Sequence, residues 1–521
     1  MKTPLFSSLR RALALARAAQ SNPQLSPDDI LAEWQARQIS RRQFLHSSGR
    51  AGLVLGVGAL AGHDLLMPLL SGPTRPNIAI VGGGLGGLAA GYHLRRRGVL
   101  ATLFEADKRI GGRMKSARIF ADGRLNTEIG AEFIDTVHED MFSLVRLLGL
   151  DQSVMDVEQD IFGIRDAIFI EGKHYSIPDV IAEFASAYPK ILADRKRLNG
   201  RHYAEYDRMS MAEYIDQLPL SGWVKKMLDA AFIGENGLET AEQSAAILVE
   251  LLEIRDNKDF LVFGESDERF KIIGGNEQIP QGLAKILREQ IRLEHRLLKI
   301  RENANRSITL FFSENGSTKE LTFDAVILAL PFTTLREVEI EMELPAIKQR
   351  AIKELGYGTN TKFILETRDR PWRTNGYRGF LFNEKVSNGW DSAQMQLDNK
   401  GMGTFTVYYG GKKGLEAVRG TENAQLDYAL PALEAAFPGT RASLTGKHEL
   451  APWPSNPFIK ASYSCYKPGQ LTAFDGVPFA PVHNLFFAGE HTSADFWGFM
   501  NGAAETGRKA AEKVLRKMKV K

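Results

Sequence analysis

The stretch NIAIVGGGLGGLAA, residues 77–90, decides the fold. Residues 77–81 form a short apolar run rich in β-branched side chains, and the GxGxxG pattern of Gly82, Gly84 and Gly87 follows directly. This pattern is typical of the strand–turn–helix unit that binds a dinucleotide. In such a unit the first glycine permits a tight turn, and the second lets the backbone approach the pyrophosphate. The third lets the helix pack closely against the strand.

The residues after these glycines continue the same pattern. One face of a predicted helix carries Leu85, Leu88, Ala89 and Tyr92, and Gly98 can end that helix. Residues 101–105 form a second apolar strand that ends in Glu105, where a carboxylate that binds ribose is expected. The N-terminus of the helix supplies partial positive charge for a phosphate. Together these features predict a dinucleotide-binding α/β unit, and a purely structural turn is the alternative.

Length and composition limit the remaining possibilities. With 521 residues the chain is too long for one hydrophobic core, and two intertwined domains are expected. Lys and Arg together number 66 against 63 Asp and Glu, so the overall charge does not indicate a nucleic-acid partner or binding to an anionic membrane. The single cysteine, Cys465, excludes an intrachain disulfide and a cysteine-based metal site. We therefore expect no metal.

The first 75 residues differ from the rest and are interpreted as a leader and linker. The segment SRRQFL, residues 40–45, precedes a glycine-rich apolar stretch over 49–62 and resembles a bacterial twin-arginine export signal. The apolar stretch is shorter than the ~20 residues of a membrane-spanning helix, so we expect no stable membrane span. Residues 59–61 offer a cleavage site, and the expected location is periplasmic or extracellular. The alternatives are a structured, uncleaved extension and, if the leader is not used, a cytoplasmic protein.

Four further segments carry a resemblance to a known family. They are the RxGGR motif of residues 109–113, GAEF at 130–133, SDERFKIIGGNEQIPQGLA at 266–284, and the closing segment 484–515. In this order they resemble the flavin amine oxidase superfamily, which includes monoamine oxidases and L-amino acid oxidases. The resemblance covers roughly residues 76–516. It is strongest to bacterial and cyanobacterial L-amino acid oxidases and dehydrogenases with twin-arginine leaders, including the group that oxidises L-arginine.

This resemblance implies an α/β fold with a Rossmann-like FAD-binding domain and a discontinuous substrate domain made of a mixed sheet and helices. The FAD-binding domain would consist of residues 76–137, 266–332 and 450–516, and the substrate-binding domain of 138–265 and 333–449.

Several elements of these domains are predicted directly from the sequence. Strands are expected over residues 291–300, 307–312 and 321–330, with Asn315 and Gly316 turning between the last two, and over 361–366 and 405–411. Residues 210–215 should open a helix.

The cofactor implied by the resemblance is noncovalent FAD. Where covalently flavinylated members carry the linking cysteine, this chain has Ser462. The expected cofactor-binding residues are Gly82, Gly84, Leu85, Gly87, Glu105, Ala106, Gly112, Arg113, Met114, Gly130, Ala131, Glu132, Leu297, Trp453, Gly489, Glu490, Gly498, Phe499, Met500 and Ala503.

The resemblance also implies the catalytic residues. Lys362 falls where the family holds a water against flavin N5, although a solvated strand lysine is the alternative. Tyr463 and Phe499 fall where two aromatic walls face the reacting amine, with Trp497 nearby, and core packing is the alternative for any single ring. Glu132 has two open interpretations, a hydrogen-bonding group on the flavin side or an acidic partner for a cationic substrate.

The function implied is oxidation of an L-amino acid to an imino acid, which water converts to a 2-oxo acid and ammonia. Basic L-amino acids are the expected substrates, with arginine as the preferred one. Phe133 stands where many L-amino acid oxidases have an arginine for the substrate carboxylate, so carboxylate recognition is left open. The alternatives are a primary-amine or polyamine oxidase and a flavoprotein without enzymatic activity. The expected partners are a small-molecule substrate and oxygen or a quinone as acceptor. The oligomeric state stays open, with a homodimer as one alternative.

Overall fold

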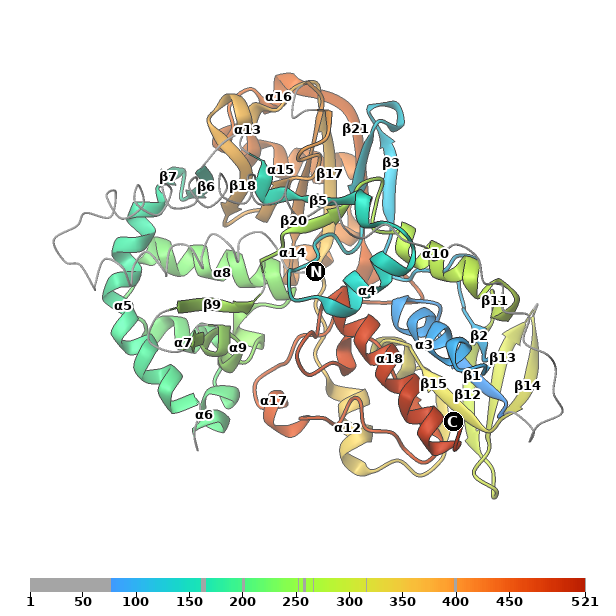
Figure 1. Ribbon diagram of the computed structural model, residues 1–521. Coiled ribbons are helices and arrows are strands. Elements are labelled where there is room, and N and C mark those ends of the chain that lie inside the picture. The colour runs from blue at the N-terminus through green and yellow to red at the C-terminus, as the bar shows by residue number, and fades with distance from the viewer. Residues whose placement is uncertain are drawn as a thin grey trace, which may run out of the picture.

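A five-stranded parallel sheet organises the half of the molecule that contains the glycine motif (Figure 1). Its strand order is β11 (Ile291–Arg292), β2 (Thr102–Phe104), β1 (Ile78–Val81), β15 (Ala325–Leu328) and β22 (Leu485–Phe487). This computed structural model describes residues 76–160, 165–198, 202–251, 253–255, 259–265, 267–314, 316–397 and 401–520. The twin-arginine leader predicted over residues 1–75 lies outside the described residues.

The central strand β1 is buried along its whole length, as expected for a parallel strand covered on both faces. Helix α3 (Leu85–Arg96) follows it after the glycines and lies beside α18 (Met500–Lys517), near the C-terminus (Figure 1). A Cβ on Gly507 would lie 2.3 Å from the backbone oxygen of Gly86, so glycine allows the two helices to pack this closely. The predicted strand, turn, helix and strand are confirmed.

A second sheet contains four strands and differs in part from the sequence prediction. Its order is β14 (Ser317–Phe323), β13 (Ile308–Glu314), β12 (Arg296–Glu302) and β16 (Glu339–Glu341). The predicted turn is supported because Glu314 pairs with Ser317, although Asn315 itself is not among the described residues.

Two of the predicted strands were each wrong as a single element. Residues 291–300 divide into β11 and β12, which belong to different sheets, because the chain turns where the His295 N–H donates to the Glu105 carbonyl. Residues 321–330 divide into the end of β14 and β15 at Asp324, whose N–H donates to the Asn77 carbonyl.

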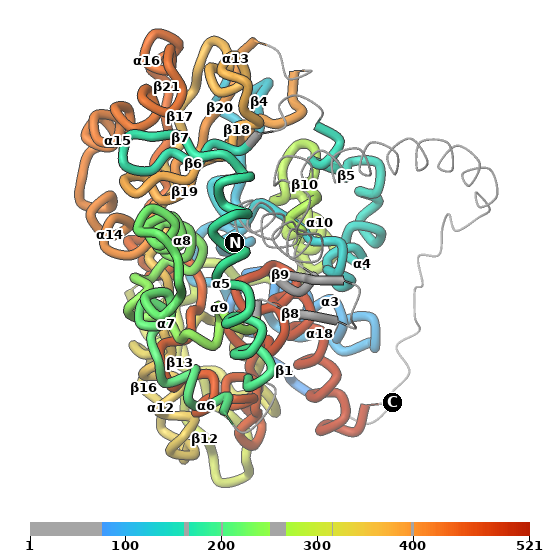
Figure 2. Tube along the Cα trace, turned by 90° about the vertical axis from the view of Figure 1, so that its left-hand side faces the viewer, coloured from blue at the N-terminus to red at the C-terminus, as the bar shows by residue number. Residues whose placement is uncertain are grey.

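The other half of the molecule is built on a seven-stranded sheet. Its order is β21 (Leu444–Ala451), β17 (Thr361–Thr367), β20 (Gly403–Tyr409), β19 (Ser387–Asp391), β18 (Tyr377–Asn383), β6 (Arg165–Ile170) and β7 (Lys173–Tyr175). Strands β17 and β20 confirm two predicted strands and are buried throughout. Helices α5 (Ile177–Leu198), α7 (Met211–Gln217) and α8 (Gly222–Asn236) lie together to one side (Figures 1 and 2). Ser210 caps α7 through a capping box with Glu213, which confirms the predicted helix start.

The first sheet assembles strands from three separated stretches of chain, 78–104, 291–328 and 485–487, so this half of the molecule is discontinuous. The α/β fold class is confirmed. The exact domain boundaries, such as residues 137 and 332, stay predictions.

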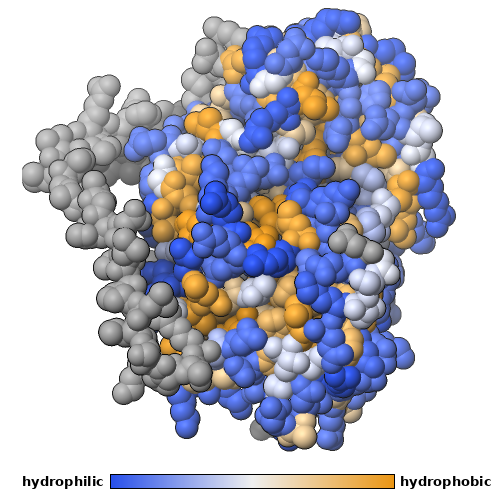
Figure 3. Space-filling model, turned by 90° about the vertical axis from the view of Figure 1, so that its right-hand side faces the viewer, coloured by the Kyte–Doolittle hydropathy of each residue, from blue (hydrophilic) through white to orange (hydrophobic). Residues whose placement is uncertain are grey.

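The face drawn in Figure 3 is mostly hydrophilic, with hydrophobic patches between the polar side chains. Within the described part of the chain, no helix combines the length and apolar character needed to cross a membrane.

Candidate flavin site

A large cavity lies at the carboxyl ends of β1 and β2, next to the glycine loop. Its empty space is about 1550 Å³, part of which is open to solvent. Of the residues predicted to contact a cofactor or substrate, the following line this cavity: Gly82, Gly84, Leu85, Glu105, Ala106, Gly112, Arg113, Met114, Ala131, Leu297, Trp453, Tyr463, Gly489, Glu490, Gly498, Phe499, Met500 and Ala503.

The three motif glycines have different structural roles. Gly82 has a φ of 112°, which favours glycine, whereas a Cβ on Gly84 would meet no atom within 4 Å and would project into open space. A Cβ on Gly87 would lie 1.9 Å from the Gly82 carbonyl oxygen. Gly87 therefore acts through close packing and does not line the cavity. Gly130, also predicted at the cofactor, is a packing glycine too, because its Cβ would lie 1.9 Å from the Arg113 carbonyl oxygen.

Glu105 fixes the end of β2 at the edge of the cavity. Its Oε2 accepts a 2.6 Å hydrogen bond from the Gly83 N–H, and its Oε1 accepts a 2.8 Å bond from the Asp107 N–H. Burial raises the pKa of this carboxyl above its ordinary value, while the two backbone donors oppose that rise. The acid thus holds the glycine loop and remains exposed to the cavity, where a ribose hydroxyl would lie.

Two helix N-termini border the cavity. Leu85 begins α3 and Met500 begins α18, and both residues line the cavity wall. The first turns of these two fully described helices contain no acidic side chain, although the Glu105 and Glu490 carboxylates accept from the Gly83 and Gly498 N–H groups just before them. Such ends suit a pyrophosphate and an electron-rich ring edge.

A partly buried ion pair joins distant segments beside these helix ends. Arg113 Nη1 donates to Glu490 Oε1 at 2.8 Å and to the Ser462 carbonyl at 2.7 Å. Glu490 also accepts from the Gly498 N–H and the Ser464 hydroxyl. Burial favours the neutral carboxyl, but Arg113 and the other donors outweigh it and lower the pKa of Glu490 to about 2. Glu490 is therefore an anion that organises the wall.

Aromatic side chains form another part of the same wall. Tyr463 and Phe499 both line the cavity, and the Tyr463 hydroxyl donates to the Glu235 carbonyl and receives a 3.3 Å bond from the Tyr408 hydroxyl. Trp453 also lines it and donates from Nε1 to the Ile129 carbonyl at 2.8 Å. The rings are thus held in fixed positions.

Trp497, predicted near these walls, does not line the cavity. It is partly buried and packs edge-on against Tyr466, with ring centroids 5.6 Å apart.

Lys362 lies behind the cavity wall and is completely buried. Its Nζ donates to the Glu128 carbonyl at 2.7 Å and to Glu132 Oε2 at 2.6 Å. The alternative of a solvated strand lysine is therefore wrong, because no part of this side chain reaches solvent. Its predicted role beside flavin N5 stays a prediction.

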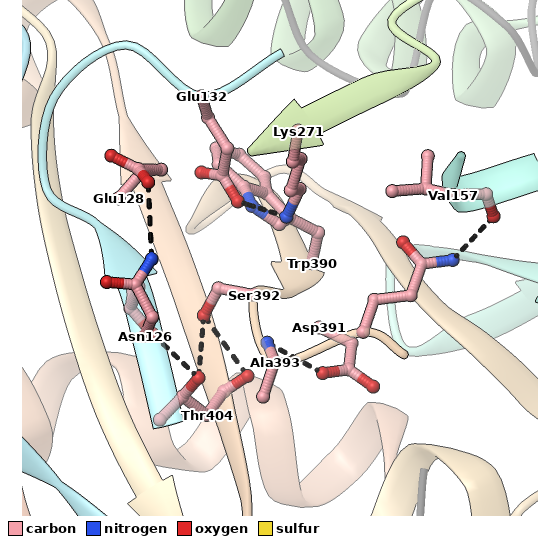
Figure 4. Close-up of polar contacts among 12 residues, drawn as sticks. Asn126, Glu128, Glu132, Val157, Lys271, Trp390, Asp391, Ser392, Ala393 and Thr404 are labelled. Atoms are coloured by element: carbon pink, nitrogen blue, oxygen red, sulfur yellow. Dashed lines mark hydrogen bonds and ion pairs between the residues drawn. The ribbon is translucent and has the colours of Figure 1, made fainter. Parts of the chain in front are cut away.

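Glu132 also lies outside the large cavity. Lys271 and Trp390 donate to its Oε1 at 2.6 and 3.0 Å (Figure 4). Lys362 donates to its Oε2. Burial opposes its ionisation, but the two lysines lower the pKa of Glu132 below its ordinary value. Its charge is already shared by two ammonium groups, so neither a direct flavin contact nor pairing with a cationic substrate finds support here.

Sequence reasoning missed Lys271, Trp390 and Tyr408. Lys271 lies within the quoted segment 266–284 but received no role, and its position on β10 (Phe270–Ile272) next to Glu132 is a long-range contact. Tyr408 could have been found from strand alternation in β20, whereas nothing local marks Trp390. A smaller cavity borders this group and is lined by Asn126, Glu128, Glu132, Met155, Lys271, Ile272, Ile273, Gly274, Ser392 and Gln396.

The described residues contain no group of three or more His, Cys, Asp or Glu side chains placed to hold a metal ion.

The residues at the large cavity fit a noncovalent flavin dinucleotide. The open position at Gly84, the helix ends and the aromatic wall match its pyrophosphate and ring system. Ser462, which lines the cavity, has no thiol, and Cys465 is buried and does not line it.

Comparison with known proteins places this site in a family. The family described as "Flavin containing amine oxidoreductase" matches residues 85–515. An L-amino-acid oxidase of Vipera ammodytes ammodytes is 24% identical over 462 residues, covering 84% of this chain and 93% of the relative. Polyamine oxidase 5 of Oryza sativa subsp. japonica is also 24% identical, covering 85% of this chain and 88% of the relative.

Solved structures show the same fold. Cyclohexylamine oxidase from Brevibacterium oxydans IH-35A superposes with a TM-score of 0.72 at 21% identity, covering 85% of this chain and 100% of that one. Putrescine oxidase bound to putrescine gives a TM-score of 0.69 at 18% identity, covering 85% and 99%. Since the family match spans most of the sequence, the chain belongs to the flavin-containing amine oxidoreductases, and its cofactor is noncovalent FAD.

Proposed function

We propose that this protein oxidises the bond between the α-carbon and nitrogen of an L-amino acid. The FAD, when bound, accepts the hydride equivalent from that carbon. Water then converts the imino acid to a 2-oxo acid and ammonia. The observation that carries the proposal is that Tyr463 and Phe499 line the same cavity as the glycine loop and both helix N-termini.

The aromatic wall supports this chemistry through desolvation. Hydride loss requires a neutral amine, and an apolar wall disfavours the ammonium form because it offers little solvation. The hydroxyl bonds of Tyr463 to Glu235 and Tyr408 hold its ring in place, so the reacting carbon can be aligned without reorganising the wall.

The wall residues also supply electrostatic support. The N-terminus of α18 offers partial positive charge to the electron-rich edge of a reduced cofactor. Arg113 and Glu490 neutralise each other within the wall, so the ion pair positions the backbone at Ser462 and Gly498 without adding net charge.

The choice of an amino acid over a simple amine rests on likeness. Two of the relatives, from Vipera ammodytes ammodytes and Pseudechis australis, are named L-amino-acid oxidase. The match to this chain covers 93% and 87% of their respective lengths. Polyamine and flavin-containing amine oxidases are equally among them, so oxidation of a primary amine or polyamine is the rival function. Both functions use the same cofactor site.

Steady-state turnover of matched pairs separates the two functions. Each L-amino acid is compared with its decarboxylated amine and with its D-enantiomer, with peroxide formation and dye reduction followed in parallel. The proposal expects higher kcat/KM for the L-amino acid, and a faster amine in every pair would overturn it. Arginine and agmatine, its decarboxylated amine, form one such pair. This pair is included because a guanidinium can stack on the aromatic rings of the wall. The alternative that Glu132 pairs with a cationic substrate finds no support, because each of its oxygens already accepts from a lysine.

A further inference from the structure

One buried carboxylate is shared by two buried lysines behind the flavin cavity. Glu132 receives Lys271 and Trp390 on Oε1 and Lys362 on Oε2, at 2.6, 3.0 and 2.6 Å. The Glu132 and Lys362 side chains are fully buried, and that of Lys271 is 9% exposed. Figure 4 shows Lys271 and Trp390 converging on the Glu132 carboxylate.

The sharing is enforced by separate elements. Lys362 lies on β17, Lys271 on β10, Trp390 on β19, and Glu132 follows β4 (Leu125–Glu128). Each lysine also lies over an aromatic ring: Lys271 Nζ is 4.6 Å from the centre of Phe133, and Lys362 Nζ is 5.0 Å from that of Trp390. With each partner held by its own strand, neither lysine can leave the carboxylate without losing packing.

The group borders the wall of the flavin cavity. Ala131 lines the cavity and precedes Glu132 directly. The adjacent carbonyls of Glu128 and Ile129 accept from Lys362 and from Trp453, and Trp453 is itself a wall residue. Lys362 and the wall residue Trp453 therefore bond to neighbouring backbone carbonyls, although Lys362 itself does not line the cavity.

We propose that Glu132 is a positioning residue. Its carboxylate is shared between Lys271 and Lys362, and it determines both the position of the Lys362 ammonium and how firmly that ammonium holds its proton. The inference rests on the proposed function, in which Lys362 serves the flavin. It assigns to Lys271 the role of tuning Lys362 through their common anion. If Glu132 were paired with Lys362 alone, Lys362 would hold its proton more tightly than it does here. Lys271 compensates part of the negative charge of Glu132, which weakens this effect.

The groups facing Lys362 give the direction of each effect. Burial lowers the pKa of Lys362, Glu132 and then Glu128 raise it, and Lys271 lowers it. The Tyr408 ring, 6.0 Å away, and the Trp390 ring also lie against the Lys362 ammonium. Removing the Glu132 charge should therefore lower the pKa of Lys362, and removing the Lys271 charge should raise it. The two substitutions act in opposite directions, which a purely structural role would not produce.

The experiment compares Glu132→Gln, Lys271→Met and Lys271→Arg in the FAD-loaded enzyme. The pH profiles of kcat and kcat/KM are measured with whichever substrate the enzyme oxidises, and the absorbance of the bound flavin is titrated against pH without substrate. We expect the Lys362 titration to shift down in Glu132→Gln and up in Lys271→Met, each by about one pH unit or more. Lys271→Arg keeps the charge and should restore the wild-type profile.

Two controls make the result specific. In a Lys362→Met background the titration assigned to Lys362 should be absent, and neither substitution should produce a pH shift. Lys348→Met removes another buried lysine, one that donates to the backbone carbonyls of Val477 and Pro478, and should leave the profile unchanged. If Glu132→Gln does not fold, Glu132→Asp and Lys271→Met still decide the question. The aspartate keeps the negative charge but is too short to hold both lysines. In Glu132→Asp, kcat should therefore fall while the pH profile shifts little.

Shifts in the same direction, or no shift in either variant, would overturn the inference. Oxidation of amines but not of amino acids would refute the proposed function while leaving these profiles measurable. If no substrate is oxidised, the absorbance titration alone decides.

Discussion

Arg113 and Glu490, 377 positions apart in the sequence, form a 2.8 Å ion pair in the wall of the flavin cavity. Arg113 comes from the segment after the second strand of the dinucleotide unit, and Glu490 comes from the segment that leads into α18. The pair ties the first and last parts of the flavin-binding half together at the place where both must contact one cofactor.

This pair predicts acid sensitivity. Because the pKa of Glu490 is lowered to about 2 from an ordinary 4.5, its ionised form stabilises the fold fully above about pH 4.5. That stabilisation is lost as the pH falls from 4.5 through 2, and amounts to no more than about 3 kcal/mol. Glu490→Gln should lower the melting temperature at pH 7 and flatten its decline below pH 4.5. A decline as steep as in the wild type would assign acid sensitivity to other groups.

Gly84 and Gly87 offer a matched pair of substitutions within one motif. Gly84→Ala adds a methyl group into open space, so the protein should fold normally and bind FAD more weakly, because the backbone can no longer approach the pyrophosphate. Gly87→Ala places its Cβ 1.9 Å from the Gly82 carbonyl oxygen, so it should destabilise the fold by several °C. FAD titration and thermal unfolding of both apoproteins measure the two effects separately. The reverse pattern would contradict the geometry.

The flavin should leave the protein on denaturation. Ser462 at the wall cannot form a thioether, and Cys465 is fully buried away from the cavity, so acid precipitation should release intact FAD into the supernatant. Cys465→Ser should behave identically. Yellow colour retained in the pellet would show a covalent bond.

The aromatic wall should affect turnover more through its rings than through its hydroxyl. Phe499→Ala opens the wall to water and should reduce kcat/KM by roughly ten-fold or more, since desolvation and alignment are both lost. Tyr463→Phe keeps the ring but loses the bonds to Glu235 and Tyr408, so a smaller reduction is expected. Steady-state kinetics at fixed FAD occupancy measure both, and a larger loss in Tyr463→Phe than in Phe499→Ala would assign the main role to the hydroxyl.

Local patterns explain what could be predicted. The glycine loop, α3 and the cap of α7 depend on residues a few positions apart, so the sequence alone indicated them. The wall residues Tyr463 and Phe499 came from family resemblance, since no local rule separates them from core aromatics.

The remaining features depend on contacts across the chain. Glu132, Lys271 and Trp390 are separated by more than a hundred positions from one another, and only the packed sheets bring them together. The break between β11 and β12 similarly depends on a hydrogen bond to Glu105, which periodicity along residues 291–300 does not reveal.

The strand order of the flavin-binding sheet also constrains when the protein can acquire its cofactor. Its edge strand, β22, ends at Phe487, and Glu490 and α18 follow still later. During synthesis from the N-terminus, the glycine loop is therefore made first and waits for nearly the entire chain before its site is complete. FAD capture must be a late step in biogenesis, and a chain that stops before residue 487 should accumulate without flavin even though it contains the whole GxGxxG motif.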